Sequence, residues 1–184
     1  MSTRIMLTNV RLSFPDLFVA RAFNASTEPK FKGTFLIDKN DPQIKVIEAA
    51  IREAAVAKFG AAKADTIIKQ IRNNPNKFCF QDGDTKDYDG YAGVMAVSAS
   101  NKTRPTVIDR DKTPLDSSDG KPYAGCYVNA SVEFFGYDNS GNGISASLRG
   151  VQFVSDGDAF SGGGAAAVDE FADVAEGATA DDLV

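Results

Sequence analysis

At 184 residues the chain has room for one domain, or for one domain and a tail. Hydrophobic residues make up 43% of it, including 13 Phe and 5 Tyr, which is enough to build a packed core. The chain contains no histidine, which removes the commonest general base, the commonest metal ligand and every nucleophile that depends on a Ser–His or Cys–His pair. The composition therefore lowers the expectation of catalysis.

The apolar runs give no sign of export or of membrane insertion. Residues 1–10 hold one basic residue and no small-residue cleavage site, and the longest apolar stretches are far too short to span a bilayer. Cys79 and Cys126 are too few and too isolated for a disulfide framework or a zinc site. We therefore expect two buried thiols in a reducing cytosol, and neither a metal nor a cofactor.

The net charge of −5 is divided unevenly along the chain. From residue 156 onward there is no Lys or Arg, and there are eight acids: Asp156, Asp158, Asp169, Glu170, Asp173, Glu176, Asp181 and Asp182. The first 155 residues hold 20 basic and 17 acidic residues, a balance of +3 against −8 for the remainder. This asymmetry is typical of a nucleic-acid binder with an acidic interaction tail. We predict a folded body over residues 1–160, and a flexible Gly/Ala linker with a disordered acidic tail over residues 161–184.

Two strands are predicted at the start of the chain. In residues 4–14 the apolar residues change parity between Leu7 and Val10, which a bulge near Thr8 and Asn9 would explain. Residues 30–37 alternate, although Leu36 breaks the pattern. Their two faces are Phe31, Phe35 and Ile37 on one side, and Lys30, Lys32 and Thr34 on the other.

A helical insert is predicted over about residues 42–73. Asp41 is a suitable N-cap before Pro42, and Gly60 is a suitable C-terminal stop for the first helix. Apolar residues recur there at helical spacing: Ile44, Ile47, Ile51, Ala54 and Phe59. A second helix is expected over residues 63–72, with Ile67, Ile68 and Ile71 facing inward.

The remaining elements are predicted to be strands. Short strands are expected at residues 77–81, 92–100 and 105–109, and the clearest pair covers residues 123–137 and 144–154, with a polar, glycine-rich turn between them. A parity shift at Gly150 indicates a bulge in a curled sheet. These patterns alone predict a mainly β protein, a small β-barrel or a sandwich, with a helical insertion. Curled strands with bulges favour a Greek-key barrel, of which the OB-fold is the frequent case, but periodicity does not by itself assign that fold.

The strand over residues 126–137 has two different faces. One face is apolar: Val128, Ala130, Val132 and Phe134. The other mixes rings with polar residues: Tyr127, Asn129, Ser131, Glu133, Phe135 and Tyr137. Rings at this spacing would suit a stacking platform, because every base has a π-face. The alternative, which the sequence leaves open, is that a helix or loop covers this face and the rings form a second core.

Basic residues occur near aromatic ones in several segments. Lys30 and Lys32 flank Phe31, and the most basic loop runs from residue 101 to residue 112. A single strand requires cations for its phosphates and flat rings for its bases. The predicted phosphate contacts are Lys30, Lys32, Lys102, Arg104 and Arg110.

Carboxylates gather between residues 82 and 89. In an EF-hand alignment Lys86 occupies the third ligand position and Asp87 occupies the position of the required glycine. The loop therefore does not match the EF-hand pattern. A two-metal nuclease is an alternative interpretation of these carboxylates, but contiguous acids in a turn fit a solvated loop better. Tyr88 and Tyr91 are predicted to add two stacking rings beside this loop.

Several motifs resemble one phage family. They are Arg11-Leu-Ser-Phe-Pro-Asp-Leu-Phe18, Phe31-Lys-Gly-Thr-Phe35, Asp82-Gly-Asp84, Tyr123-Ala-Gly-Cys-Tyr127 and Gly143 to Leu148. The resemblance covers about residues 4–162 and is to the family labelled DUF2815, which is similar to the OB-fold single-stranded-DNA-binding proteins of tailed phages. It implies sequence-independent binding of single strands in phage DNA replication or recombination.

The sequence therefore predicts a non-enzymatic protein that binds single-stranded DNA in the cytoplasm of an infected bacterium. The predicted base-stacking residues are Tyr88, Tyr91, Tyr127, Phe135 and Tyr137. The acidic tail is expected to compete with DNA and to dock phage or host replication proteins, and a homodimer is compatible with the sequence. Two alternatives remain, a metal-dependent phage nuclease that uses the carboxylates of residues 82–89 and a phage structural or morphogenesis protein.

Overall fold

A computed structural model describes residues 3–22 and 24–160, together with 171, 172 and 174. The elements follow in the order β1 (Arg4–Arg21), β2 (Lys30–Asp38), α1 (Gln43–Phe59), α2 (Ala61–Ile71), β3 (Phe80–Asp82), β4 (Val94–Asn101), β5 (Thr106–Ile108), β6 (Tyr127–Asp138) and β7 (Asn142–Ser155). Two short 3-10 turns lie at Gly83–Thr85 and Ser117–Asp119. The predicted strands and helices are therefore all present, with shifted ends.

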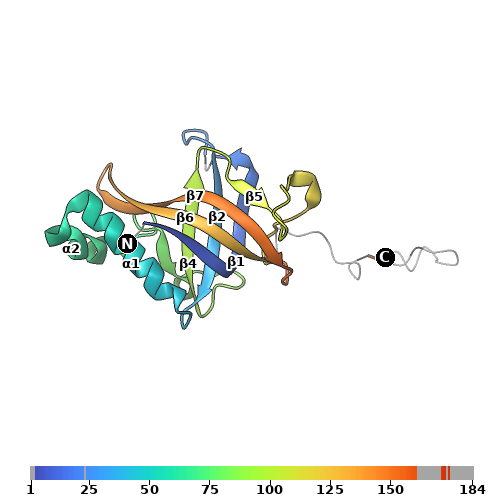
Figure 1. The fold of residues 1–184 in the computed structure, drawn as a ribbon, viewed down its shortest axis with the longest axis horizontal. Helices are drawn as coiled ribbons and strands as arrows, with labels where there is room; N and C mark the ends of the chain where they lie inside the picture. The colour runs from blue at the N-terminus through green and yellow to red at the C-terminus, as the bar shows by residue number, and fades with distance from the viewer. Residues whose placement is uncertain (1–2, 23, 161–170, 173, 175–184) are drawn as a thin grey trace.

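The strands β1, β2, β4, β7 and β6 close into a barrel (Figure 1). Their pairings are antiparallel except for that of β4 with β7, which is parallel and joins Ser100 to Ser147. The short strands β3 and β5 extend the sheet at β4 and β7. This arrangement confirms the predicted mainly β, OB-like barrel with a helical insertion.

Residues 77–79 and the end of β4 complete the closure against β7. The backbone N–H of Ile144 donates to the carbonyl of Lys77 at 2.8 Å, and the N–H of Cys79 donates to the carbonyl of Ile144 at 3.1 Å. The side-chain amide of Asn101 donates to the carbonyl of Leu148 at 3.2 Å. The loop before β3 is thereby fixed beside the start of β7.

β1 is longer than predicted because it bends twice and pairs with two different partners. Its first half pairs with β6, with a register shift between Leu7 and Val10 where Asn9 has a φ of 50°. The bulge predicted near Thr8 and Asn9 is thus confirmed. Its second half pairs with β2, with another irregularity after Ser13 where Phe14 has a φ of 46°. Bulges increase the local bend of a strand, which a small barrel requires.

The bulge predicted at Gly150 is also confirmed. Ser131 pairs with Gly150 while the next residue of β6 pairs with Leu148, so the ladder skips one residue of β7. The inward residues of β7 change parity at that point and all are buried: Ile144, Ala146, Leu148, Val151 and Phe153.

The two helices pack beside one another at one end of the barrel (Figure 1). Their apolar faces are buried as predicted. The first helix begins one residue later than the pattern indicated, because Pro42 is its N-cap and makes no side-chain cap bond. The carboxylate of Asp41 instead accepts from the N–H of Gln43 at 2.9 Å. Neither helix is long and apolar enough to cross a membrane.

The packed body continues to Phe160, whose N–H donates to the carbonyl of Ala124 at 3.1 Å. The guanidinium of Arg11 lies 4.3 Å from the centroid of the Phe160 ring, and its Nη2 donates to the carbonyl of Asp158 at 2.7 Å. The predicted linker and acidic tail fall outside the described residues, apart from residues 171, 172 and 174. The boundary at residue 160 therefore stays a prediction.

Adjacent phenylalanines on β6 offer a test of this register. Phe134 is 1% exposed in the barrel core, and Phe135 is 42% exposed on the outer face. We expect Phe134→Ala to lower the free energy of unfolding by about 3–5 kcal/mol, because it removes a buried ring and leaves a cavity. Phe135→Ala should lower it by about 1 kcal/mol or less. Urea denaturation measures both, and equal losses would contradict the assigned faces.

Candidate nucleic-acid interface

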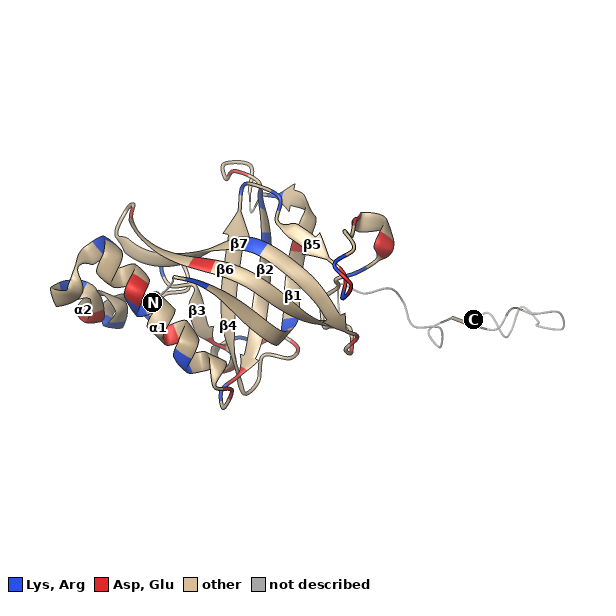
Figure 2. Cartoon of the chain, viewed as in Figure 1, with Lys and Arg blue, Asp and Glu red and all other residues tan. Residues whose placement is uncertain are grey.

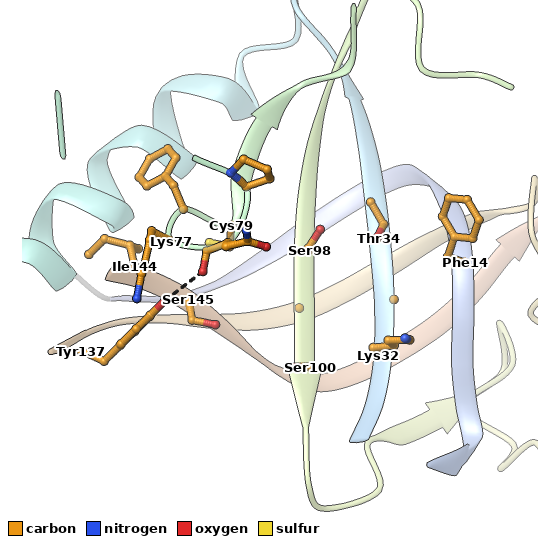
Figure 3. A pocket seen from close by; sticks show the side chains of 15 residues that line it. Phe14, Lys32, Thr34, Lys77, Cys79, Ser98, Ser100, Tyr137, Ile144 and Ser145 are labelled. Carbon is orange, nitrogen blue, oxygen red and sulfur yellow. Dashed lines mark hydrogen bonds between the residues drawn. The ribbon is translucent and has the colours of Figure 1, made fainter. Parts of the chain in front are cut away.

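A groove of about 340 Å³ crosses the outside of the barrel where β2, β4 and β7 lie side by side (Figure 3). The lining side chains that matter for the argument below are Phe14, Lys32, Thr34, Lys77, Ser98, Ser100 and Tyr137. The groove runs from the irregularity in β1 to the hairpin between β6 and β7. It therefore brings together segments that are far apart in the sequence.

The floor of the groove follows from the alternation of β2 and β4. Lys32 pairs with Ser100 and Thr34 pairs with Ser98, so these four outward side chains form two neighbouring rows. Predicting Lys32 and Thr34 on the face opposite Phe35 was correct, since Phe35 is buried in the core. Short hydroxyl side chains keep the floor low and leave room above it.

Tyr137 and Lys77 border one end of the groove. The phenol of Tyr137 donates to the carbonyl of Asn76 at 3.3 Å, and its ring lies against Gly143, where a Cβ atom would be 2.2 Å from the ring. The ammonium of Lys77 lies 5.8 Å from the centroid of that ring and donates to two hairpin carbonyls, at 3.2 and 2.9 Å. Burial raises the pKa of Tyr137, so the phenol stays neutral at physiological pH.

Phe14 borders the other end and belongs to a cluster of three rings. Its centroid lies 5.0 Å from that of Tyr88 and 6.4 Å from that of Tyr91. Tyr88 is 55% exposed, whereas Tyr91 is 3% exposed and donates from its phenol to the hydroxyl of Ser13 at 3.0 Å. Tyr91 was predicted to stack on bases, but its burial gives it a supporting position beneath the two exposed rings.

Sequence reasoning missed Phe14. Strand alternation predicts that Phe14 lies on the same inner face as Val10 and Leu12, and both of those residues are buried. The left-handed backbone at Phe14 breaks the parity and turns its ring outward. The following Pro15 was an available signal, because proline lacks an N–H and within sheets favours edges and bulges.

Cations gather where β2 begins, beside the loop that follows β4 (Figure 2). Register places Lys30 opposite Arg21, and Phe31 opposite Asn101, so the loop with Lys102 reaches the same end of the sheet. Acids share this region. The Lys102 ammonium lies 2.8 Å from the carboxylate of Glu28. Asp16 lies 2.9 Å from Arg21 and 3.7 Å from Lys32.

The two predicted arginines do not line the groove. The guanidinium of Arg104 lies 5.3 Å from the ring centroid of Phe18 and donates to the carbonyl of Leu115 at 3.5 Å. Arg110 lies beyond β5, 5.9 Å from the ring centroid of Phe153. β5 is the edge strand next to β7, and Arg110, which follows β5, therefore lies away from β2 and β4.

The outer face of β6 carries Tyr127, Phe135 and Tyr137, as its alternation predicted. Tyr127 and Phe135 are eight residues apart, about 27 Å along a strand, so the three rings do not form one platform. Tyr127 lies 5.8 Å from the guanidinium of Arg11, against the backbone of Gly157. The ring centroid of Phe135 lies 6.4 Å from that of Tyr137, but Phe135 borders a hollow beside α1, and of the three rings only Tyr137 lines the groove. The rings are therefore partly covered, and stacking of bases on this face stays a prediction.

Two of the carboxylates of the 82–89 loop that were candidate metal ligands, Asp82 and Asp84, are engaged by a lysine. The Lys39 ammonium lies 2.8 Å from Asp82 and 2.5 Å from Asp84, and Asp84 also accepts from the N–H of Gly93 at 2.9 Å. The bonds to Lys39 lower the pKa of both carboxyl groups and raise the pKa of the lysine. Among the residues that the structure describes, no three His, Cys, Asp or Glu side chains are grouped as a metal site.

Both cysteines are buried, in agreement with the sequence analysis. Burial raises the pKa of Cys79 to about 12 and that of Cys126 to about 11. Thiolates are the reactive form of cysteine, so both thiols are unreactive at neutral pH. Cys79 contributes to the floor of the groove only as a small apolar side chain.

The sequence and the fold both resemble those of known phage proteins. The chain is 54% identical over 172 residues to putative protein p50 of Acyrthosiphon pisum secondary endosymbiont phage 1. The aligned residues make up 93% of this chain and 94% of that protein. It superposes with a TM-score of 0.72, at 25% identity, on the single-stranded DNA-binding protein of bacteriophage Enc34 in complex with ssDNA, over 85% of this chain and 89% of that one. The bacteriophage T7 single-stranded DNA-binding protein gp2.5 shares the fold, with a TM-score of 0.54 at 15% identity over 87% of this chain and 91% of that one.

The family described as the ssDNA-binding protein of Enterobacter phage Enc34 matches residues 3–184. That match extends over nearly the whole chain and confirms the resemblance to phage single-stranded-DNA-binding proteins that the sequence motifs indicated. The chain belongs to the Enc34 ssDNA-binding protein family.

Proposed function

We propose that this protein binds single-stranded DNA, without reading its sequence, in the groove across β2, β4 and β7. The observation that carries the proposal is the combination of aromatic rings at both ends of one groove with lysines along it. Membership of the Enc34 family and the likeness to the Enc34 protein in its complex with ssDNA support it.

Lys32 and Lys77 are the phosphate contacts in the groove. Lys77 uses two of its three N–H donors on hairpin carbonyls, which fixes the ammonium and leaves one donor for a ligand. Lys32 lies 3.7 Å from Asp16, a separation that leaves its ammonium open to an additional anion. Lys30 and Lys102 extend the cationic path beyond the groove, at the end where β2 begins.

Bases are held by stacking on Tyr137 and by the hydroxyl floor. A serine or threonine hydroxyl can both donate and accept, so Thr34, Ser98 and Ser100 accommodate any base edge. Stacking on a ring is likewise tolerant of sequence. The groove is therefore suited to coating a strand during replication or recombination in the host cytoplasm.

Five of the ten residues predicted from the sequence belong to this proposed site or its approaches. They are Lys30, Lys32, Lys102, Tyr88 and Tyr137. The five placed elsewhere are Tyr91, Arg104, Arg110, Tyr127 and Phe135. We add Lys77 and Phe14 to the proposed site because both line the groove.

A binding role also accounts better than catalysis for the remaining polar residues. Asp82 and Asp84, two of the carboxylates of residues 82–89 on which a nuclease would depend, form ion pairs with Lys39. They lie on β3 and the turn after it, and neither lines the groove that holds the strand in this proposal. We therefore propose a protein that binds DNA without cleaving it.

Salt dependence tests the proposed division of roles. Affinity for oligo-dT should fall with salt at a log–log slope of about −0.7 per phosphate contacted, and single strands should bind far more tightly than a duplex of equal length. Lys32→Ala or Lys77→Ala should make the slope shallower by roughly one contact, whereas Tyr137→Ala should weaken binding at an unchanged slope. Fluorescence anisotropy measures both quantities, with Lys63→Ala on α2 as the control. Equal slopes for all the variants, or equal affinity for duplex, would refute the proposal.

The acidic tail is proposed to compete with DNA for the groove and to dock replication proteins of the phage or host. Its attachment point supports this, because Phe160 packs against the small cluster of Leu36, Tyr91 and Ala96, which lies beneath the exposed rings of Phe14 and Tyr88. The chain thus leaves the body close to one end of the groove. A short flexible tether gives an effective concentration in the millimolar range, enough for weak attraction to matter.

Deletion of residues 165–184 should therefore tighten binding of oligo-dT, most clearly at low salt where charges are weakly screened. Replacing the acids of that segment by their amides should have the same effect as the deletion, because the proposed competition is electrostatic. Titration calorimetry at two salt concentrations provides the comparison. If low-salt affinity is the same with and without the tail, the tail does not compete for the groove.

A further inference from the structure

Phe14 is an exposed ring on a backbone conformation that aromatic residues rarely adopt. It is 54% exposed and has a φ of 46°. A residue other than glycine in the left-handed region is strained and persists only where its surroundings impose it. Such strain concentrates at functional sites. The strain at Phe14 turns outward a large apolar side chain that the parity of β1 would otherwise have placed in the core.

The neighbours of Phe14 in the sequence impose this conformation. The hydroxyl of Ser13 is buried and accepts from the phenol of Tyr91 at 3.0 Å, which fixes β1 directly before the ring. Pro15 follows directly and has no N–H for the ladder, and the pairing with β2 resumes only at Asp16. Phe14 is thereby held between two fixed points.

Tyr88 completes a pair with Phe14. The two rings meet edge to face, with centroids 5.0 Å apart and an interplanar angle of 75°. Tyr91 lies 5.2 Å from Tyr88 and supports both rings from below. Tyr91 is itself packed against Leu36 and Phe160, so the support belongs to the folded body.

The pair lies where a bound strand would pass. Phe14 lines the groove together with Lys32 and Thr34, and Figure 3 shows its ring beside Thr34 at the end away from Tyr137. A strand with a phosphate against Lys32 would bring an adjacent base to this end. Two exposed rings that are already ordered would bind that base without a further ordering cost.

We propose that Phe14 and Tyr88 form a preformed stacking site for one unpaired base at the β1 end of the groove. The inference rests on the proposed single-strand binding and adds a second base contact, opposite Tyr137. Its ligand is the aromatic face of a nucleobase, not the phosphate backbone. Loss of either ring should therefore change base-dependent affinity and leave the salt dependence unchanged.

Substitutions with matched ligands test this proposal. Phe14→Ala and Tyr88→Ala should each weaken binding of oligo-dT by roughly 5- to 150-fold, the range expected for the loss of one stacked base, at an unchanged salt slope. The double variant should lose less affinity for oligo-dT than the product of the two single fold-losses, because both rings contact the same base. Val46→Ala, which shortens an exposed apolar side chain on α1, is the control. A fully abasic strand of equal length should bind the wild type and Phe14→Ala equally.

The absence of tryptophan from the sequence offers a direct optical probe. Phe14→Trp should retain affinity, and its fluorescence should be quenched on addition of oligo-dT but not of the abasic strand. Val46→Trp should show no such change. This variant also keeps a ring at the site, so it reports on stacking even if Phe14→Ala is poorly folded.

The outcomes separate this proposal from the one on which it rests. If the wild type binds oligo-dT but Phe14→Ala binds equally well and Phe14→Trp is not quenched, the stacking site is refuted and the binding function stands. If the wild type shows no preference for single strands, both are refuted. An equal loss of affinity for abasic and normal strands would assign Phe14 a structural role and would also refute the stacking site.

Discussion

Where β4 meets β7, the barrel closes through the parallel pairing of Ser100 with Ser147 and the bond from the Asn101 amide to the carbonyl of Leu148. The loop at residues 77–79 continues the closure through its backbone bonds to Ile144. Because these contacts place the loop beside the β6–β7 hairpin, they also position Lys77 next to Tyr137. The groove lies along this seam, so its shape depends on the same hydrogen bonds that close the barrel.

The bends in β1 determine the other end of the groove. A small barrel needs strongly curved strands, and β1 curves at Asn9 and again at Phe14. The second irregularity serves both fold and site, since it bends the strand and turns an aromatic ring outward. Tyr91 connects this ring to the rest of the body through Ser13 and through the cluster that Phe160 covers. Phe160, the last residue described before the proposed acidic tail, thereby lies close to the exposed rings.

Alternation and turn chemistry were enough to predict a small β-barrel or sandwich, the helical insert and the bulges near Asn9 and Gly150, because these depend on local sequence. The choice of an OB-like barrel also needed the resemblance to the phage family. Lys32 and Tyr137 were assigned to the outer surface for the same reason. The rest depended on contacts between distant segments. Tyr91 is buried because a loop folds onto β1 and β2. Arg110 lies far from the groove because β5 pairs with β7, and Lys77 lies beside the groove because residues 77–79 take part in barrel closure. No local pattern encodes these contacts, so the sequence alone could not place these three residues.

The central claim is that a single strand lies in the groove between the Phe14–Tyr88 pair and Tyr137. Ultraviolet cross-linking of oligo-dT to the full chain, followed by mass spectrometry of the peptides, locates the bound bases directly. The account predicts cross-links at Phe14, Tyr88 and Tyr137. Cross-links concentrated instead at Tyr127 and Phe135, on the outer face of β6, would contradict it and would return the site to the platform first predicted from that strand.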